Sequence, residues 1–67
     1  MNKMFTVHIG WVGQFKNARL TWKTVYAPDW MTAKTQVEAL LNAGMLRVVQ
    51  VDEGEFPTGL TVWEVDE

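Results

Sequence analysis

The residues of this chain that could take part in chemistry are a single histidine and a small group of acids. His8 lies near the N-terminus, whereas Asp52, Glu53 and Glu55 surround Gly54. One imidazole with scattered carboxylates is not a ligand set for a transition metal, and the acids lack the twelve-residue spacing of a calcium loop. We therefore predict no metal site, and interpret His8 as an ordinary strand residue and the acids as a solvated turn.

Motifs for covalent or phosphate chemistry are missing from the sequence. It contains no cysteine, no Gly-x-Ser-x-Gly, no metalloprotease signature and no phosphate-binding glycine loop. The segment Gly10-Trp11-Val12-Gly13 is too short for such a loop and comes at the end of a predicted strand, so a turn explains it. The sequence predicts no enzyme activity, no catalytic residue and no cofactor.

The chain has 67 residues, so we expect one domain spanning 1–67. The formal net charge of −2 conceals an uneven distribution. Residues 1–34 hold five basic side chains and one acid, a net charge of +4, whereas residues 35–67 hold one basic side chain and seven acids, a net charge of −6. A charged binding face and acids gathered at turns and tails for solubility are both compatible with this split.

No stretch approaches the roughly 20 apolar residues of a membrane span. Thr6, His8 and Gly10 interrupt the N-terminal segment, so it lacks the apolar region of a signal peptide. We therefore expect a cytoplasmic protein without membrane contact.

One segment, Asp29 to Gly44, has a helical period. Pro28 favours an extended residue before it and so ends the preceding strand. Asp29 is placed as N-cap, and Gly44 as the left-handed residue that stops the helix. A stripe on one face is formed by Trp30, Ala33, Val37, Leu40, Leu41 and Gly44. A helix of about fifteen residues is marginal alone in water, so this stripe must pack on the strands.

Four segments have the composition of strands, namely Met4–Val12, Leu20–Ala27, Met45–Asp52 and Leu60–Val65. In the first, apolar residues at odd positions alternate with Thr6, His8 and Gly10, as expected of a half-buried strand whose odd positions face the helix. In the second, Lys23 makes the phase ambiguous. We favour Val25 and Ala27 facing the helix, with Trp22 and Tyr26 on the open face of the sheet.

The element order ββαββ and the short connections predict an α+β fold. We expect a four-stranded antiparallel sheet of strand order 2-1-3-4, with the helix packed on one face. The other face is left to solvent or a partner. The second and fourth strands are open edges, which Lys23 and Glu64 could protect with charge.

Aromatic residues on a sheet can also stack nucleic-acid bases, and Trp22, Tyr26 and Trp63 are candidates. Affinity for phosphates, however, scales with basic contacts. The chain has only six basic residues and a negative net charge. These numbers argue against nucleic-acid binding.

A pattern of local features extends over residues 4–52. A strand ends in Tyr26-Ala27, a capped helix carries Ala33 and ends in Ala43-Gly44, and a valine-rich strand follows. In these features the chain resembles the small ββαβ proteins encoded by bacteriophages, such as the host RNA polymerase inhibitors of short-tailed coliphages.

The resemblance implies a host protein as partner. In that inhibitor family, arginines on the strand after the helix grip the polymerase together with acidic side chains. The corresponding strand here is Met45–Asp52, where Arg47 is the only basic residue and Gln50 and Asp52 follow. A further hairpin through Trp63 also departs from the pattern.

The function predicted from the sequence is a non-enzymatic protein-binding module, phage-encoded, that modulates or inhibits a host protein machine such as RNA polymerase, a nuclease or a defence complex. The predicted binding residues are Trp22 and Tyr26 on the open face and Arg47, Asp52, Glu53 and Glu55 at a charged edge. One alternative is a structural or self-assembling subunit, such as a homodimer, that pairs through edge strands. The other is single-stranded nucleic-acid binding through the aromatic sheet face.

Overall fold

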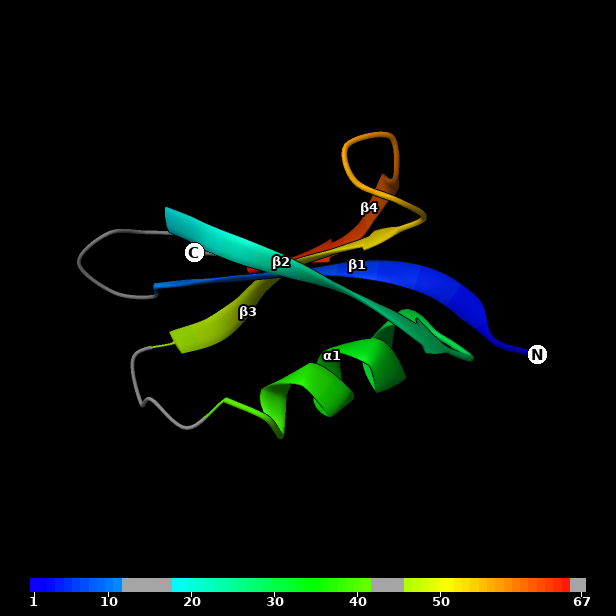
Figure 1. The fold of residues 1–67 in the computed structure, drawn as a ribbon, viewed down its shortest axis with the longest axis horizontal. Helices are drawn as coiled ribbons and strands as arrows, with labels where there is room; N and C mark the ends of the chain where they lie inside the picture. Colours follow the sequence, from blue (N-terminus) through cyan, green and yellow to red (C-terminus); the bar gives the residue numbers. More distant parts are fainter. Residues whose placement is uncertain (12–17, 42–45, 66–67) are drawn as a thin grey trace.

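A computed structural model describes residues 1–11, 18–41 and 46–65. It confirms the predicted α+β class and the element order ββαββ (Figure 1). The elements are β1 (Lys3–Trp11), β2 (Ala18–Ala27), α1 (Trp30–Glu38), β3 (Leu46–Glu53) and β4 (Leu60–Glu64). Gly44 and most of the predicted turn at 13–19 lie outside the described residues.

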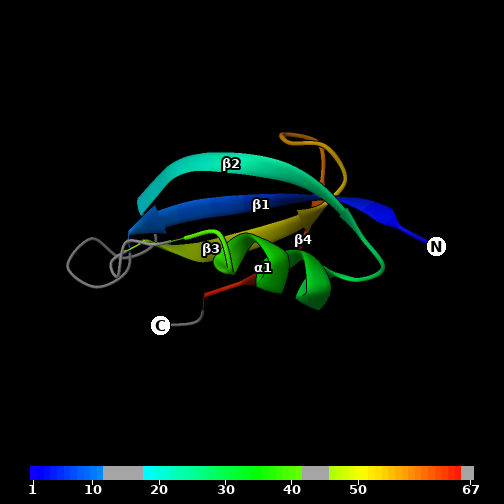
Figure 2. The same cartoon turned by 60° about the horizontal axis from the view of Figure 1, so that its bottom comes forward.

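The four strands form one antiparallel sheet of order β2-β1-β3-β4, as predicted (Figure 2). β1 and β2 pair without interruption from Lys3 opposite Ala27 to Ile9 opposite Thr21, and the register shifts beyond Ile9. β1 pairs with β3 on its other side, so it is a central strand. β2 and β4 are the two edges of the sheet.

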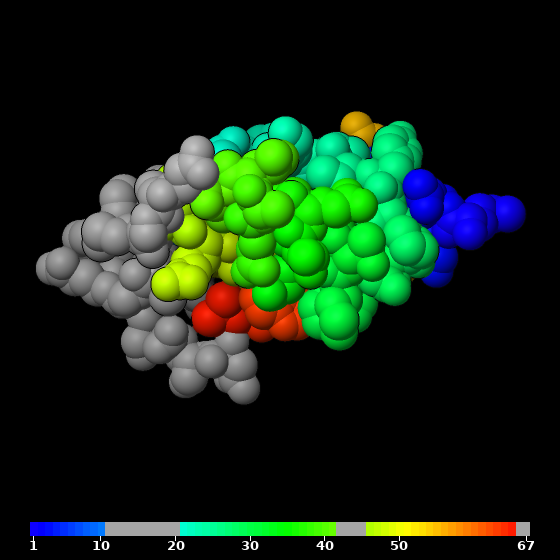
Figure 3. Space-filling model, turned by 90° about the horizontal axis from the view of Figure 1, so that it is seen from below, coloured from blue at the N-terminus to red at the C-terminus, as the bar shows by residue number. Residues whose placement is uncertain are grey.

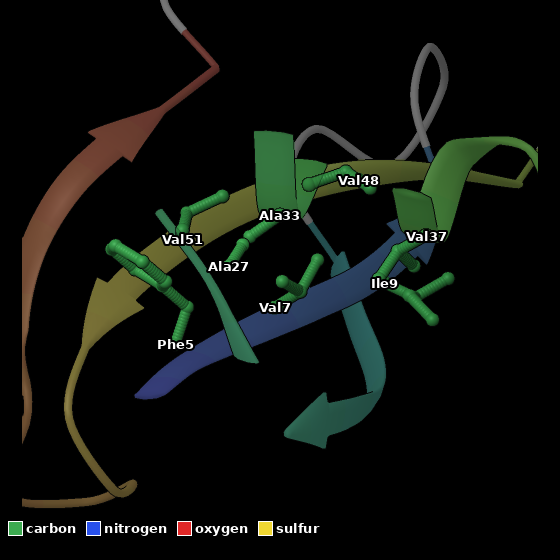
Figure 4. Packing of buried hydrophobic residues seen from close by; sticks show 8 residues of the cluster. All are labelled: Phe5, Val7, Ile9, Ala27, Ala33, Val37, Val48 and Val51. Carbon is green, nitrogen blue, oxygen red and sulfur yellow. The ribbon is translucent and has the colours of Figure 1, made fainter. Parts of the chain in front are cut away.

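The hydrophobic core lies between α1 and one face of the sheet (Figure 4). β1 contributes its odd positions, which confirms the predicted phase of this strand. Val25 packs against the core and Ala27 is fully buried, so the favoured phase of β2 is also confirmed. The buried cluster consists of Phe5, Val7, Ile9, Ala27, Ala33, Val37, Val48 and Val51.

Asp29 caps α1 as predicted. Its backbone is extended, and its carboxylate accepts a hydrogen bond from the backbone N–H of Thr32 at 2.8 Å. This bond to the free end of the helix lowers the pKa of Asp29, because it stabilises the ionised carboxylate. α1 covers the centre of its face of the molecule, and β4 lies beside it (Figure 3).

The predicted helix is too long, because α1 ends at Glu38 and residues 39–41 are not helical. The N–H of Leu40 bonds to the carbonyl of Val37 at 2.9 Å, and the N–H of Leu41 to that of Glu38 at 3.1 Å. Bonds between residues three apart tighten the last turn. Leu41 still packs on the core, but Leu40 is 63% exposed and leaves the predicted stripe.

Two members of the predicted apolar stripe, Val37 and Leu40, can be compared by mutation. We expect Val37→Ala to lower the free energy of unfolding by about 2 kcal/mol, because it removes two methyl groups from a fully buried site. Leu40→Ala should change it by less than about 0.5 kcal/mol, because the side chain is exposed. Urea denaturation of both variants measures the difference. Equal losses would show that Leu40 packs in the core after all.

Candidate binding surface and the polar cluster beneath it

The face of the sheet opposite α1, here called the far face, is not fully open. Thr6 and His8 point to it from β1, on the face that we expected to be left to solvent or a partner. Instead they are 0% and 1% exposed. The reason is the connection between β3 and β4, residues 54–59, which lies on the side of the sheet away from α1 (Figure 1). This connection covers the central strand, and hydrogen bonds to β1 hold it there.

Three hydrogen bonds attach the connection to β1. The hydroxyl of Thr6 donates to the carbonyl of Gly54 at 2.6 Å and accepts from the N–H of Phe56 at 3.2 Å. The N–H of Gly54 donates to the carbonyl of Met4 at 2.9 Å. Gly54 has a φ of 105°, which L side chains rarely adopt, so glycine suits the first residue of the connection.

Beneath the connection, His8 and Asp52 form a buried pair. Nε2 of His8 lies 3.1 Å from Oδ2 of Asp52, and the two side chains are only 2% and 5% exposed. Gln50 donates from Nε2 to Oδ1 of Asp52 at 2.7 Å and to the hydroxyl of Thr61 at 3.2 Å. An ionised carboxylate only accepts hydrogen bonds, so Nε2 of His8 carries the proton. The polar cluster, defined as His8, Gln50, Asp52 and Thr61, thus joins β1, β3 and β4 across the far face.

The interpretation of Asp52 as a solvated turn residue is wrong. Asp52 is the seventh residue of β3, and its side chain points under the connection. Burial raises the pKa of Asp52, but the hydrogen bonds from Gln50 and His8, together with a weaker one at Thr61, outweigh burial and lower it overall. The carboxylate therefore remains ionised inside the protein, stabilised by its donors.

Aromatic rings lie against His8, at one end of the polar cluster. The ring of Phe56 lies 4.9 Å from that of His8, nearly perpendicular to it, and 4.8 Å from that of Trp22. Trp22 is also the direct cross-strand neighbour of His8. A carboxylate–imidazole pair can serve as a general base where a substrate can reach it. Here both side chains are covered, so the geometry favours a structural role for the pair.

Within the ranges 1–11, 18–41 and 46–65, no three histidine or acidic side chains gather as metal ligands would. His8 and Asp52 are only two such groups, and Gln50 and Thr61 complete their surroundings with an amide and a hydroxyl. The described side chains therefore offer no ligand set of the kinds that hold zinc or calcium.

Two of the predicted binding residues form an exposed patch. Trp22 and Tyr26 lie four positions apart on β2 and are 53% and 58% exposed. Because side chains alternate along a strand, both point to the far face, beside the covered centre. We call this pair the aromatic patch. The ring of Trp22 also packs against that of Phe56.

Trp63 does not belong to this patch, contrary to the expectation that it could join Trp22 and Tyr26. Its ring stacks on that of Trp30 from α1, with centroids 6.0 Å apart and planes 14° from parallel. The Lys34 ammonium lies 4.9 Å from the same ring and also 3.1 Å from Glu38. Trp63 therefore packs on the helix side of the sheet, with a cation–π contact over its ring.

The four predicted charged residues do not form one edge. Arg47 is exposed near the start of β3, whereas Asp52 and Glu53 end that strand, roughly 17 Å further along at the usual rise per residue. β3 also lies between β1 and β4, inside the sheet. Glu53 and Glu55 are exposed, and Glu53 lies 3.8 Å from Lys3 in an exposed ion pair that contributes little stability.

Comparisons of the chain with known protein families, with curated proteins and with solved structures found no match. None of the helical residues that the structure describes belongs to a segment long and apolar enough to cross a bilayer.

The energy of the buried pair can be measured with a double-mutant cycle. We expect Asp52→Ala to lower the free energy of unfolding by about 3 kcal/mol, because it leaves the donor of His8 buried without an acceptor and removes one of the two acceptors of Gln50. His8→Ala should cost less when Asp52 is already absent, with a coupling of about 1–2 kcal/mol. Glu55→Ala removes an exposed acid of the same connection and is the matched control, expected to change stability by less than about 0.5 kcal/mol. Additive losses at His8 and Asp52 would show that the two side chains do not interact.

Acid should weaken the fold partly through Asp52. Its pKa in the folded protein is below the ordinary 3.8, so the unfolded chain binds the proton more readily. The stability that Asp52 contributes is therefore fully present above about pH 4 and is lost as pH falls through the folded pKa. Asp52→Asn removes this titration, so its unfolding free energy should fall less steeply between about pH 5 and pH 2 than that of the wild type. Parallel pH profiles of the two proteins would contradict the assignment.

Proposed function

We propose that this chain is a non-enzymatic protein-binding module whose contact surface is the aromatic patch, Trp22 and Tyr26. The observation that supports this proposal best is the exposure of two large aromatic side chains on one face of a regular strand. Among the described residues, eight apolar side chains form the buried core, whereas Trp22 and Tyr26 are 53% and 58% exposed. Tyrosine and tryptophan dominate binding energy where they occur in interfaces.

The strand that carries the aromatic patch is held in place by neighbouring elements. β2 pairs with β1 along the whole patch, and Trp22 lies against Phe56, whose backbone N–H donates to the hydroxyl of Thr6. A side chain held in this way loses little conformational freedom on binding, which favours affinity. Aromatic side chains have only two rotatable bonds and so add contact area at a low entropic penalty.

The partner in this proposal is a host protein assembly, and the chain acts as a phage-encoded modulator or inhibitor of it. The resemblance to small phage-encoded ββαβ inhibitors supports this partner class and makes host RNA polymerase the first candidate, with nucleases and defence complexes next. Arg47 is the only basic residue of β3. In this chain, contacts from Trp22 and Tyr26 would therefore take the place of the arginine contacts by which that inhibitor family binds the polymerase.

Binding can be tested with two double variants that remove similar apolar surface from opposite faces. We expect Trp22→Ala with Tyr26→Ala to weaken binding to purified bacterial RNA polymerase, or to a protein retained from host lysate, by at least about tenfold. Met31→Ala with Leu40→Ala removes exposed apolar side chains of α1 and its last turn and should leave binding unchanged. Circular dichroism confirms that both variants are folded.

Two results would contradict this function. Retention of the same proteins by the wild type and by both double variants would show that the aromatic patch does not bind them. Tight binding of a single-stranded oligonucleotide at low salt, lost in the Trp22/Tyr26 variant alone, would instead assign the patch to base stacking.

A further inference from the structure

The outer edge of β2 is the longest unpaired strand edge among the described residues. β2 has ten residues and pairs with β1 only, and Figure 2 shows it on the outside of the sheet. From Thr21 to Ala27 its pairing with β1 is regular, with no bulge to twist the edge away. Lys23 is the only charged residue in that stretch. Proteins usually protect such an edge or pair it with another strand.

The other edge, β4, is less suitable for pairing. It has only five residues and a register shift against β3, and it ends in the acidic Glu64. Short, irregular and charged strands resist edge-to-edge association. The contrast identifies β2 as the edge on which an added strand would be accepted.

We propose that a second copy of this chain occupies the β2 edge. The two β2 strands would run antiparallel around a two-fold axis perpendicular to the sheet and join two four-stranded sheets into one of eight. Such an axis keeps the far faces of both copies on the same side. A far-face residue of one β2 strand therefore lies opposite a far-face residue of the other, and a helix-side residue opposite a helix-side residue.

The register follows from the side chains. With Thr24 on the axis, Trp22 of each copy lies opposite Tyr26 of the other, and cross-strand aromatic pairs of this kind stabilise sheets. The same register places Lys23 opposite Val25 and Thr21 opposite Ala27. It uses the whole regular stretch of β2, because Thr24 is the centre of Thr21–Ala27.

Neighbouring registers are less favourable. An axis at Lys23 sets two ammonium groups directly opposite each other, which is destabilising. An axis at Trp22 places Tyr26 opposite Ala18, which lies beyond the regular stretch of β2. An axis at Val25 places Trp22 opposite Pro28, which lies beyond the end of the strand. Only the axis at Thr24 pairs both aromatic residues and separates the like charges.

This dimer goes beyond the proposed function and does not depend on it. The second copy would take the backbone groups along the edge, whereas the aromatic side chains project from the far face. The dimer would therefore carry four aromatic side chains close together on one face, two from each copy, and α1 of both copies on the other.

Self-association of the full chain is measured by sedimentation equilibrium from about 1 µM to about 1 mM, the range in which a modest interface becomes populated. We expect a reversible monomer–dimer equilibrium. Thr24→Lys places like charges on the axis and should raise the dissociation constant at least about tenfold. Gln36→Lys makes the same charge change on the exposed surface of α1 and should leave it unchanged. A monomeric mass at every concentration would overturn the proposal, and so would an equal effect of both variants.

The register has its own test, because the chain contains no cysteine. Thr24→Cys should form an intermolecular disulfide under mild oxidation, since a residue on the axis meets its own copy within disulfide range. Thr21→Cys should not, because the register separates the two copies of this position by roughly 20 Å. Cross-linking at Thr21, or at a Lys23→Cys variant in preference to Thr24, would overturn this register. These readings are independent of any host partner, so they separate failure of the dimer from failure of the proposed function.

Discussion

The structure depends on one constraint: β1, one of the two central strands, is buried on both of its faces. Its odd residues, such as Val7, meet α1 across an apolar core, whereas Thr6 and His8 are buried on the far face. Antiparallel sheets often leave one face to water. Here the far face carries polar side chains that have lost their water and must be hydrogen-bonded within the protein. The bond between His8 and Asp52 is the centre of that arrangement.

This constraint explains why the far face has two distinct parts. The connection 54–59 covers His8 and Asp52, and its bonds to Thr6 and to the backbone of Met4 fix its position. Phe56 then reaches Trp22, where the covered area ends. On its outer side β2 pairs with no other strand of the described residues, so its aromatic side chains and outer backbone groups remain available for binding.

The sequence predicted the parts of this fold that depend on local periodicity. The alternation in β1, the phase of β2 set by Val25 and Ala27, the cap at Asp29 and the strand order all follow from short-range patterns and short connections. For the same reason, the exposure of Trp22 and Tyr26 could be predicted. The end of α1 could not be predicted, because apolar spacing continues through Leu40 although the chain tightens after Glu38.

The polar cluster could not be predicted, because it depends on contacts between residues more than forty positions apart. In the sequence, His8 and Asp52 look like residues on the solvent side of a half-buried strand. They are buried because the connection 54–59 folds back over the sheet and covers them. The one local indication was the presence of Gly54 and Phe56 within a single turn. The buried pair also bears on function, because His8 lies directly across from Trp22 and under Phe56. The orientation of the aromatic patch therefore depends on a buried hydrogen bond between His8 and Asp52, and a change at either residue would alter the surface that we assign to binding.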